Sequence, residues 1–213
     1  MALRYFTNVT SGSAMADAFD SVSHDRLTRR LQGSWSGHTL LDLALRALFT
    51  VAGGYLSVDD TVVAKPYARL LGEAAWVWSH QDRKVLFGVS GVLLVWTDGQ
   101  SRMPLAFRVW QKGGAAKYDL ALELLSYARN RLQCKPHFVL FDSWSPSRQL
   151  LQRIRDSGGS LVCQLKKNRR FEGRALRSYK PQPYWQALGS LSGGLKVFVV
   201  RDRRTYYATN RLT

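Results

Sequence analysis

The sequence predicts an α/β protein in which helices flank a mixed β-sheet. Three observations lead to this fold class: apolar runs of strand length, amphipathic helical segments between them, and glycine or proline residues at the breaks. With 46% hydrophobic residues, the 213-residue chain has enough apolar side chains for one substantial core. We expect three parts: a short helical segment over 1–53, an α/β core over 54–168 and an incomplete β-rich region over 169–213.

The N-terminal part contains two expected helices. Ser23 can cap the first of them, over 24–32. In the second, over 38–51, leucines recur at helical spacing until Gly53-Gly54 ends the run. The two helices either pack as structural elements, which we prefer, or belong to a DNA-binding or dimerisation unit.

Three expected strands open the core. Apolar and polar residues alternate over 55–60, so a buried strand should end in a pair of aspartates. A long apolar strand is predicted over 85–96. The dipeptide Asp98-Gly99 then predicts a tight hairpin turn, after which 103–110 returns as the next strand.

The remainder of the core alternates helices and strands. The apolar spacing predicts a helix over 117–132 and then a buried strand over 137–142, which again ends in an aspartate. Ser145-Pro146 should cap and open a helix that reaches Asp156, because serine caps helices and proline fits the first helical position. The segment 160–165 is the last expected strand of the core.

Short strands alternate with glycine and proline breaks in the C-terminal region, most clearly at 195–200 and 205–209. The chain stops four residues after the second of these strands, without an obvious closing element. We therefore expect the β-rich region to be truncated.

The charge of the chain points to a polyanionic partner. Its formal net charge is +16, with 31 Lys and Arg against 15 Asp and Glu, and its pI is near 10.4. Residues 145–213 alone carry 15 basic and three acidic side chains, a net +12. A concentrated positive field attracts nucleic acid by releasing counterions, which we favour over a basic protein with no dedicated partner.

Other sequence features limit the class of protein. No apolar run has the length of a membrane-spanning helix, and the N-terminus has no secretory signal pattern, so we expect no membrane association. Cys134 and Cys163 lie in apolar stretches without a second cysteine nearby. We expect buried free thiols in a reducing cytoplasm.

Two aspartates at predicted strand ends form the candidate site. If the strands that end in Asp60 and Asp142 are neighbours, their carboxylates meet at one edge of the sheet. Carboxylate oxygens are the ligands that Mg²⁺ prefers, and paired metal ions can drive phosphodiester chemistry. The alternative is that each aspartate is an ordinary cap or turn residue.

Four segments, in this order, resemble insertion-sequence transposases of the Asp-Asp-Glu type. The closest resemblance is to the cut-and-paste group, whose ribonuclease-H-like core is interrupted by a β-strand insertion, and it covers about residues 20–213. The segments are LSVDDTVVAKP (56–66), the tryptophan-rich run 76–110, HFVLFDSWSPSRQLLQRI (137–154) and LVCQLKKNR (161–169).

The resemblance implies a ribonuclease-H-like mixed sheet and assigns roles to particular residues. Asp60 corresponds to the first catalytic aspartate and Asp142 to the second, and both would bind Mg²⁺ or Mn²⁺. Asp59 would be a solvated or supporting neighbour. The substrate would be DNA, both the transposon ends and the target, cleaved and joined by two-metal phosphodiester chemistry.

The third family carboxylate is a glutamate within a Tyr-x-x-Arg…Glu pattern, and this sequence has no such pattern. We therefore expect a truncated copy that is inactive alone. It would reside in the bacterial cytoplasm, associated with the nucleoid, as a homodimer or a mixed dimer with a full-length transposase. The alternatives are a non-enzymatic remnant that modulates such a transposase, or a nuclease completed by Asp59, Glu123 or Glu172.

A basic cluster follows the last core strand and is the main candidate for phosphate contacts, with a solvated turn as the alternative. Lys65, five residues beyond Asp60, is a weaker candidate for the same role. The tryptophans at 78, 96 and 110 are expected in the core. The cluster consists of Lys166, Lys167, Asn168, Arg169 and Arg170.

Overall fold

The computed structural model divides the chain into two compact units, residues 1–48 and residues 49–213, which are described separately. In the first unit the four residues Asp25, Arg29, Leu41 and Leu45 are helical. The remainder of the helices predicted over 24–32 and 38–51 lies outside the described residues. The structure describes residues 23, 25, 29, 41, 45, 53–67, 70–142, 147–179 and 184–211.

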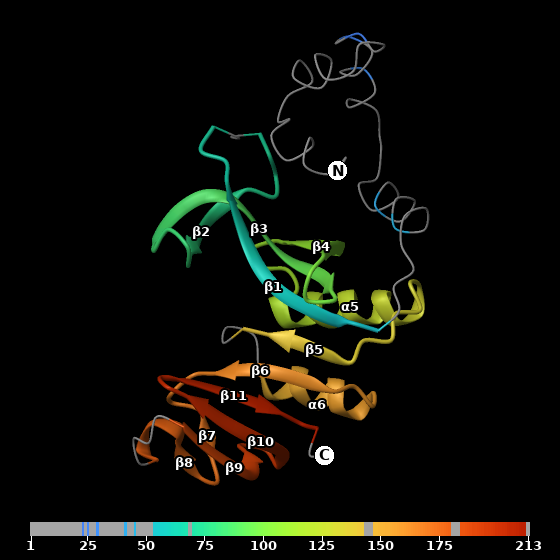
Figure 1. Ribbon diagram of the computed structural model, residues 1–213. Helices are drawn as coiled ribbons and strands as arrows, with labels where there is room; N and C mark the ends of the chain where they lie inside the picture. The colour runs from blue at the N-terminus through green and yellow to red at the C-terminus, as the bar shows by residue number, and fades with distance from the viewer. Residues whose placement is uncertain are drawn as a thin grey trace. The chain divides into compact units, whose positions relative to one another are not determined.

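The second unit is built on one eleven-stranded sheet, counted over the described residues, together with two α-helices and a short 3₁₀ helix (Figure 1). The elements in chain order are β1 (Tyr55–Ala64), β2 (Ala75–Ser79), β3 (Lys84–Thr97), β4 (Arg102–Trp110), α5 (Lys117–Asn130), β5 (Phe138–Phe141), α6 (Arg148–Asp156), β6 (Leu161–Leu165), β7 (Arg170–Phe171), β8 (Arg174–Ala175), η1 (Leu176–Ser178), β9 (Tyr184–Leu191), β10 (Leu195–Asp202) and β11 (Thr205–Thr209).

The first half of the sheet has the strand order β4-β3-β1-β5-β6. Strand β3 pairs antiparallel with β1 and β4, whereas β5 runs parallel to both β1 and β6. Helix α5 connects β4 to β5, and α6 connects β5 to β6. Three antiparallel strands followed by two parallel ones form the mixed sheet of a ribonuclease-H-like core, so the predicted fold class is confirmed.

The C-terminal strands continue the same sheet. Strand β11 pairs antiparallel with β6, and the order then runs β11-β10-β9-β7-β8. The hydrogen-bonded ladder is therefore unbroken between the predicted core, 54–168, and the predicted β-rich region, 169–213. This pairing does not decide a domain boundary, and the three-part division stays a prediction.

Both α-helices pack on one face of the sheet, and the main core lies between them and the strands. The buried side chains of the strands alternate with more exposed ones, as expected of strands that are covered on one face. Leu56 and Val139 line the same groove as residues of α5 and α6. The fully buried core residues include Val58, Leu124, Leu150, Leu161 and Cys163.

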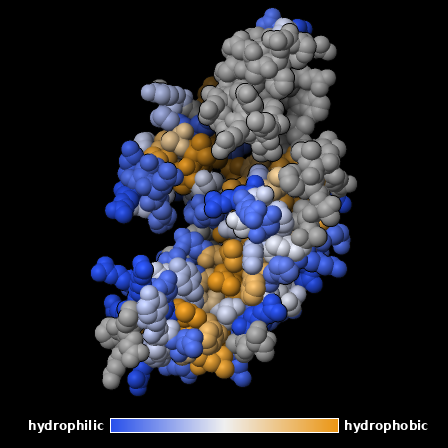
Figure 2. All heavy atoms as spheres, in the orientation of Figure 1, coloured by the Kyte–Doolittle hydropathy of each residue, from blue (hydrophilic) through white to orange (hydrophobic). Residues whose placement is uncertain are grey.

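The strands also carry exposed apolar side chains. Leu188 of β9 is 62% exposed, and Trp76 and Trp78 of β2 are 71% and 52% exposed. Figure 2 shows hydrophobic residues near the end of the sheet that contains β2, between hydrophilic ones. The expectation that Trp78 belongs to the core is therefore wrong, because β2 is a short strand that pairs with β3 alone.

Two predicted element boundaries are corrected by the structure. Strand β1 continues to Ala64 instead of ending at Asp60, because β3 pairs with all ten of its residues. Helix α6 begins at Arg148, and its N-cap is Ser147, whose hydroxyl accepts a hydrogen bond from the Leu150 amide at 3.2 Å. The predicted cap at Ser145-Pro146 lies outside the described residues.

The predicted hairpin at Asp98-Gly99 is confirmed, although its loop is longer than a two-residue turn because Thr97 pairs with Arg102. The Asp98 carboxylate accepts hydrogen bonds from the amides of Gln100 and Ser101 at 2.9 and 2.6 Å. These two N–H groups, with Ser101 contributing most, lower the pKa of the Asp98 carboxyl. The loop is therefore held by the aspartate as well as by the glycine.

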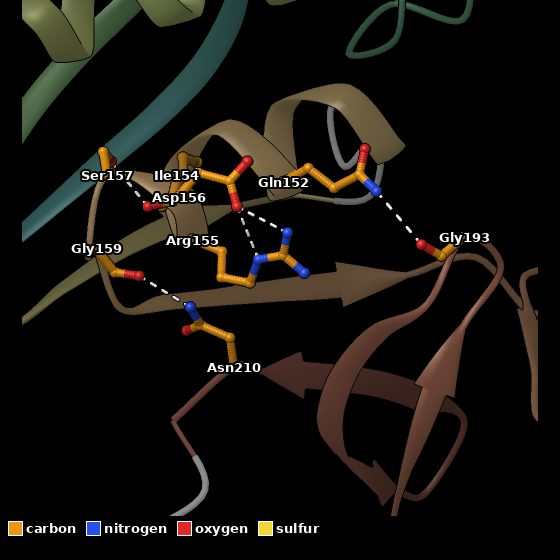
Figure 3. Close-up of polar contacts among 8 residues, drawn as sticks. All are labelled: Gln152, Ile154, Arg155, Asp156, Ser157, Gly159, Gly193 and Asn210. Atoms are coloured by element: carbon orange, nitrogen blue, oxygen red, sulfur yellow. Dashed lines mark hydrogen bonds and ion pairs between the residues drawn. The ribbon is translucent and has the colours of Figure 1, made fainter.

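One asparagine connects the two halves of the sheet. Asn210, which follows β11, accepts a hydrogen bond from the Leu161 amide at 2.8 Å and donates one to the Gly159 carbonyl at 2.8 Å. Figure 3 shows the second of these contacts, beside the end of α6. The side chain thus satisfies two backbone groups at the start of β6 and aligns β11 with it.

Both cysteines are buried free thiols, as predicted. Burial raises the pKa of the Cys163 thiol to about 12, so it stays protonated and unreactive at neutral pH. No described helix has the length and apolar character needed to cross a membrane.

Candidate active site

Asp60 lies near the middle of β1, on the face that the helices cover. Its backbone pairs with Val92 of β3, and it shares a strand face with Val58 and Leu56, both buried. Its side chain is 14% exposed. Because a carboxylate with so little exposed surface loses most of its hydration, it requires hydrogen bonds, a cation or a metal ion in place of water.

A lysine is the cationic partner of Asp60. Lys117 is the first residue of α5, and its ammonium donates a hydrogen bond to Asp60 Oδ2 at 2.7 Å. The same ammonium lies 5.8 Å from the centroid of the Trp110 ring, at the end of β4. Three elements, β1, β4 and α5, therefore meet at this ion pair, which the sequence analysis did not identify.

Asp59 points to the other face of β1 and is exposed. Its Oδ1 accepts a hydrogen bond from the backbone amide of Asp60 at 2.8 Å. This contact orients the backbone at Asp60. The two adjacent aspartates thus lie on opposite faces of the strand, as the alternation of side chains predicts.

Asp142 directly follows β5, the strand that runs parallel to β1. The last pair of that ladder joins Val58 to Phe141, so the next step places Asp142 beside Asp59 and one residue from Asp60 along β1. Neighbouring strands lie about 4.8 Å apart. The two strands are therefore neighbours, which is the condition under which the sequence analysis expects the carboxylates to meet, and the metal site that Asp60 and Asp142 would form stays a prediction.

The two aspartates offer the type of donor atom that a hard divalent cation binds. Asp60 and Asp142 offer carboxylate oxygens, which Mg²⁺ and Mn²⁺ prefer. Across the described ranges, no group of three or more His, Cys, Asp or Glu side chains is arranged to hold a metal ion. The structure therefore shows the Asp60–Lys117 ion pair, and the participation of Asp142 in the same site stays a prediction.

The alternative third carboxylates have other partners. Glu123 of α5 forms an ion pair with Arg108 at 3.2 Å. Glu172 lies between β7 and β8 and accepts a hydrogen bond from the Ser190 amide. Five strands separate β7 from β1 in the sheet order, which amounts to roughly 29 Å at the usual strand spacing. Glu172 is therefore remote from Asp60.

The predicted basic cluster lies at the same end of the sheet as Asp142. Strands β1, β5 and β6 are parallel, so the turn after Leu165 and the residue after Phe141 lie at the carboxyl ends of neighbouring strands. Lys166, Lys167 and Asn168 are exposed. The structure thus brings these side chains to the edge that carries Asp142, and their contact with phosphate stays a prediction.

Arg169 and Arg170 differ in their exposure. Arg169 is partly buried, and its Nε finds no hydrogen-bond partner in the described part of the chain. Its positive charge also acts on Cys163, where it opposes the effect of burial on the thiol pKa. Arg170 begins β7 and is exposed.

Lys65 lies farther from the site than the basic cluster. It follows the last residue of β1, and its backbone amide donates to the Phe87 carbonyl at 2.9 Å. Five residues of extended chain separate it from Asp60, about 17 Å. A contact between Lys65 and DNA would therefore fall away from the reacting phosphate.

A groove between α5 and α6 lies at the opposite end of the core. It is lined by Leu56, Cys134 and Ile154, together with Lys135 and Ser160, which precede β5 and β6. These positions are the amino ends of the parallel strands. The groove is thus separate from the edge that carries Asp142.

Two comparisons with known proteins found similarities. Residues 54–205, more than half of the chain, match the family model described as "Transposase DDE domain". A cryo-EM structure of the piggyBac transposase synaptic complex with hairpin DNA is similar at a TM-score of 0.49 and 14% identity. The similarity covers 97% of this chain and 48% of that chain, so this chain spans about half its length. No curated protein matches.

Proposed function

Because the chain belongs to the transposase DDE domain family, we propose that Asp60 and Asp142 are two carboxylates of a DNA-transposase active site. The observation that supports this proposal most is the pairing of β1 with β5, which brings both aspartates to neighbouring parallel strands. Family membership identifies the chain as a DNA transposase domain. The residue roles and the chemistry at the site belong to the proposal.

Members of this family use divalent metal ions, and Asp60 and Asp142 would hold Mg²⁺ or Mn²⁺ here. The ion would activate water and stabilise the leaving oxygen of a phosphodiester. The protein side chains would position the DNA. Asp59 would fix the backbone of Asp60 through its contact with the Asp60 amide.

The DNA partner would be bound chiefly through residues 145–213. This part of the chain has a net charge of +12, and Lys166, Lys167, Asn168 and Arg170 are exposed at the carboxyl ends of the core strands. Lysine and arginine contacts to phosphate position DNA without reading its sequence. We propose non-specific binding of transposon ends and target DNA through this surface.

The 213 residues alone would not cleave DNA efficiently. They contain no Tyr-x-x-Arg…Glu pattern, and the part of the chain that the structure describes has no cluster of three metal-binding side chains. Two carboxylates leave much of the coordination of a divalent cation to water, so its affinity should be low. We therefore propose that this chain binds DNA but is inactive alone.

The test is a plasmid assay with Mg²⁺ that records nicking, together with a binding assay on a labelled duplex. Wild-type protein, Asp60→Ala and Asp142→Ala are compared with Asp156→Ala, which removes an exposed carboxylate paired with Arg155. We expect DNA binding by all four proteins and no nicking. The substitutions should leave binding unchanged or slightly stronger, because each removes a negative charge.

Three outcomes would change the proposal. Nicking that is lost in both Asp60→Ala and Asp142→Ala, but retained in Asp156→Ala, would mean that the chain completes its own metal site. The proposal that the chain is inactive alone would then be wrong, and the assignment of Asp60 and Asp142 to the active site would be right. Absence of DNA binding, or nicking that survives both substitutions, would contradict the proposal itself.

A second candidate function follows from the same two observations, the strong positive charge and the lack of a three-residue metal cluster among the described residues. The chain would bind DNA and modulate a full-length transposase by forming a mixed dimer. Co-expression with an intact relative from a bacterial insertion sequence, followed by co-purification, tests this function. Failure to recover a mixed complex would eliminate it.

The cellular setting belongs to the proposal as well. The resemblance to insertion-sequence transposases supports a bacterial cytoplasmic protein that associates with the nucleoid. Imaging of a fluorescent fusion in a bacterial host would test this localisation, since a DNA-bound protein should coincide with the nucleoid. A homodimer would be detected by analytical ultracentrifugation of the purified chain.

A further inference from the structure

The Asp60–Lys117 ion pair occupies the position where the proposed metal site needs an open carboxylate. The ammonium lies 2.7 Å from Asp60 Oδ2, which is hydrogen-bonding distance. A lysine ammonium and a divalent cation compete for the same carboxylate oxygen because both are small, hard positive ions. We propose that Lys117 is the resident counter-ion of Asp60 and that a divalent cation binds Asp60 only by displacing the Lys117 ammonium.

The position of Lys117 on its helix supports this role. It is the first residue of α5, where the helix dipole disfavours positive charge and favours acidic residues such as Asp119 of the same turn. No capping side chain holds this end of the helix, since Ala116 is the N-cap. The local sequence thus gives no reason for a lysine at this position. The largely buried carboxylate of Asp60 gives one, because it needs a cationic partner.

The displacement requires no rearrangement of the fold. The Lys117 side chain is 26% exposed, so its ammonium has a route to solvent. Lysine has a flexible four-carbon stem and a single-point charge, and it exchanges partners more easily than a bidentate arginine. The Trp110 ring, 5.8 Å from the ammonium, offers it a second attractive contact. The displaced ammonium would therefore remain near the site.

The inference rests on the proposed metal site and is tested separately from it. Binding of Mn²⁺ to the full chain is measured by the electron paramagnetic resonance signal of free Mn²⁺. The variants are Lys117→Gln and Asp60→Asn, alone and combined. The matched control is Lys112→Gln, which removes the same charge from an exposed lysine five residues upstream. Circular dichroism confirms that each variant is folded.

We expect Lys117→Gln to bind Mn²⁺ roughly five- to tenfold more tightly than wild type, because the metal no longer competes with an ammonium. Lys112→Gln should bind as wild type does, and adding Asp60→Asn to Lys117→Gln should abolish the gain. An affinity of Lys117→Gln equal to that of Lys112→Gln, with binding still dependent on Asp60, would overturn this inference alone. Binding unaffected by Asp60→Asn would overturn the metal site and the inference together.

A second measurement uses the wild-type chain, so it does not depend on the folding of a variant. Lysines are acetylated briefly with and without Mg²⁺ at constant ionic strength, and the labelling of Lys117 and Lys112 is quantified by mass spectrometry. Mg²⁺ should raise the labelling of Lys117 several-fold and leave that of Lys112 unchanged. Equal labelling of Lys117 with and without saturating Mg²⁺ would overturn the displacement.

Discussion

A largely buried carboxylate needs polar or charged partners, and for Asp60 of β1 the cationic partner comes from a distant part of the chain. Asp60 and Lys117 are separated by 57 residues, and their side chains are 14% and 26% exposed. Such a pair contributes little net stability, because the desolvation of both charges offsets their attraction. Removal of one partner is costlier than removal of both, which makes the pair sensitive to single substitutions.

The backbone at Gly54 should also be sensitive to a single substitution. Its φ angle is +68°, and an added Cβ would lie 2.6 Å from Trp96 Nε1 and 2.7 Å from the Thr97 carbonyl oxygen. Trp96 Nε1 also donates to the Gly53 carbonyl at 2.9 Å. We expect Gly54→Ala to lower the free energy of unfolding by about 2–4 kcal/mol, through backbone strain and overpacking.

Urea denaturation of the purified chain measures this effect, with Gly72→Ala as the control. An added Cβ at Gly72 meets no atom within 4 Å. The control should therefore change the free energy of unfolding by less than about 0.5 kcal/mol. Equal stability of the two variants would show that Trp96 and the turn at Gly54 relax around the new methyl group.

At the scale of elements, apolar periodicity predicted most of the core. The helix predicted over 117–132 is α5, and the strand predicted over 85–96 is β3, each within two residues. Strands β2 and β9 were not predicted, because β2 has only five residues and Gln, Gly and Ser interrupt the apolar pattern of β9. Pairing with β3 and β10 imposes the extended conformation on them.

The candidate site was predictable only in part, for a similar reason. Asp60 and Asp142 could be related because each follows a run of apolar strand residues, although β1 continues four residues beyond Asp60. The Lys117 contact depends on the packing of α5 against β1, and no local pattern encodes that packing. The partial burial of Arg169, whose Nε has no hydrogen-bond partner among the described residues, was not predicted either, since the sequence analysis treated the whole cluster alike.

The link between β11 and β6 yields a prediction at this scale. Asn210→Ala removes the partners of two backbone groups, the Leu161 amide and the Gly159 carbonyl. We expect a loss of about 2–3 kcal/mol in the free energy of unfolding, because unsatisfied backbone groups keep their desolvation cost. Chemical denaturation measures this loss.

Two further variants show which hydrogen bond causes the loss of stability expected for Asn210→Ala. Asn210→Asp retains the acceptor for the Leu161 amide but replaces the donor to Gly159 by a carboxylate oxygen that repels the carbonyl, so a loss as large as that of Asn210→Ala would locate most of the effect at Gly159. Asn130→Ala removes an exposed contact to Ser126 at the end of α5 and should be nearly neutral. If Asn130→Ala and Asn210→Ala were equally stable, the two hydrogen bonds would not hold the strands together.

At the scale of the whole molecule, the distribution of charge governs the proposed DNA binding. Each lysine or arginine that neutralises a phosphate makes the logarithm of the affinity fall more steeply with the logarithm of salt concentration. Replacing Lys166, Lys167 and Arg170 together by glutamine should reduce the slope by roughly 2–3 units, because each contact contributes about 0.9. Fluorescence anisotropy with a labelled duplex at several salt concentrations measures the slope.

The matched control removes three positive charges elsewhere, namely Lys84, Arg102 and Lys135, all of them exposed. It has the same net charge as the triple variant of the basic cluster. If binding depended on net charge alone, both triple variants would change the slope equally. A reduction confined to the cluster variant would locate the phosphate contacts at the carboxyl end of β6.

The interior position of β11 also has a consequence for biosynthesis. Of the described strands it is the last to be translated, yet it lies between β6 and β10 and pairs with both. Until Thr209 has left the ribosome, the nascent chain exposes two unpaired edges that can associate with other polypeptides. Pairing of β11 with β6 and β10 therefore covers both edges in a single step.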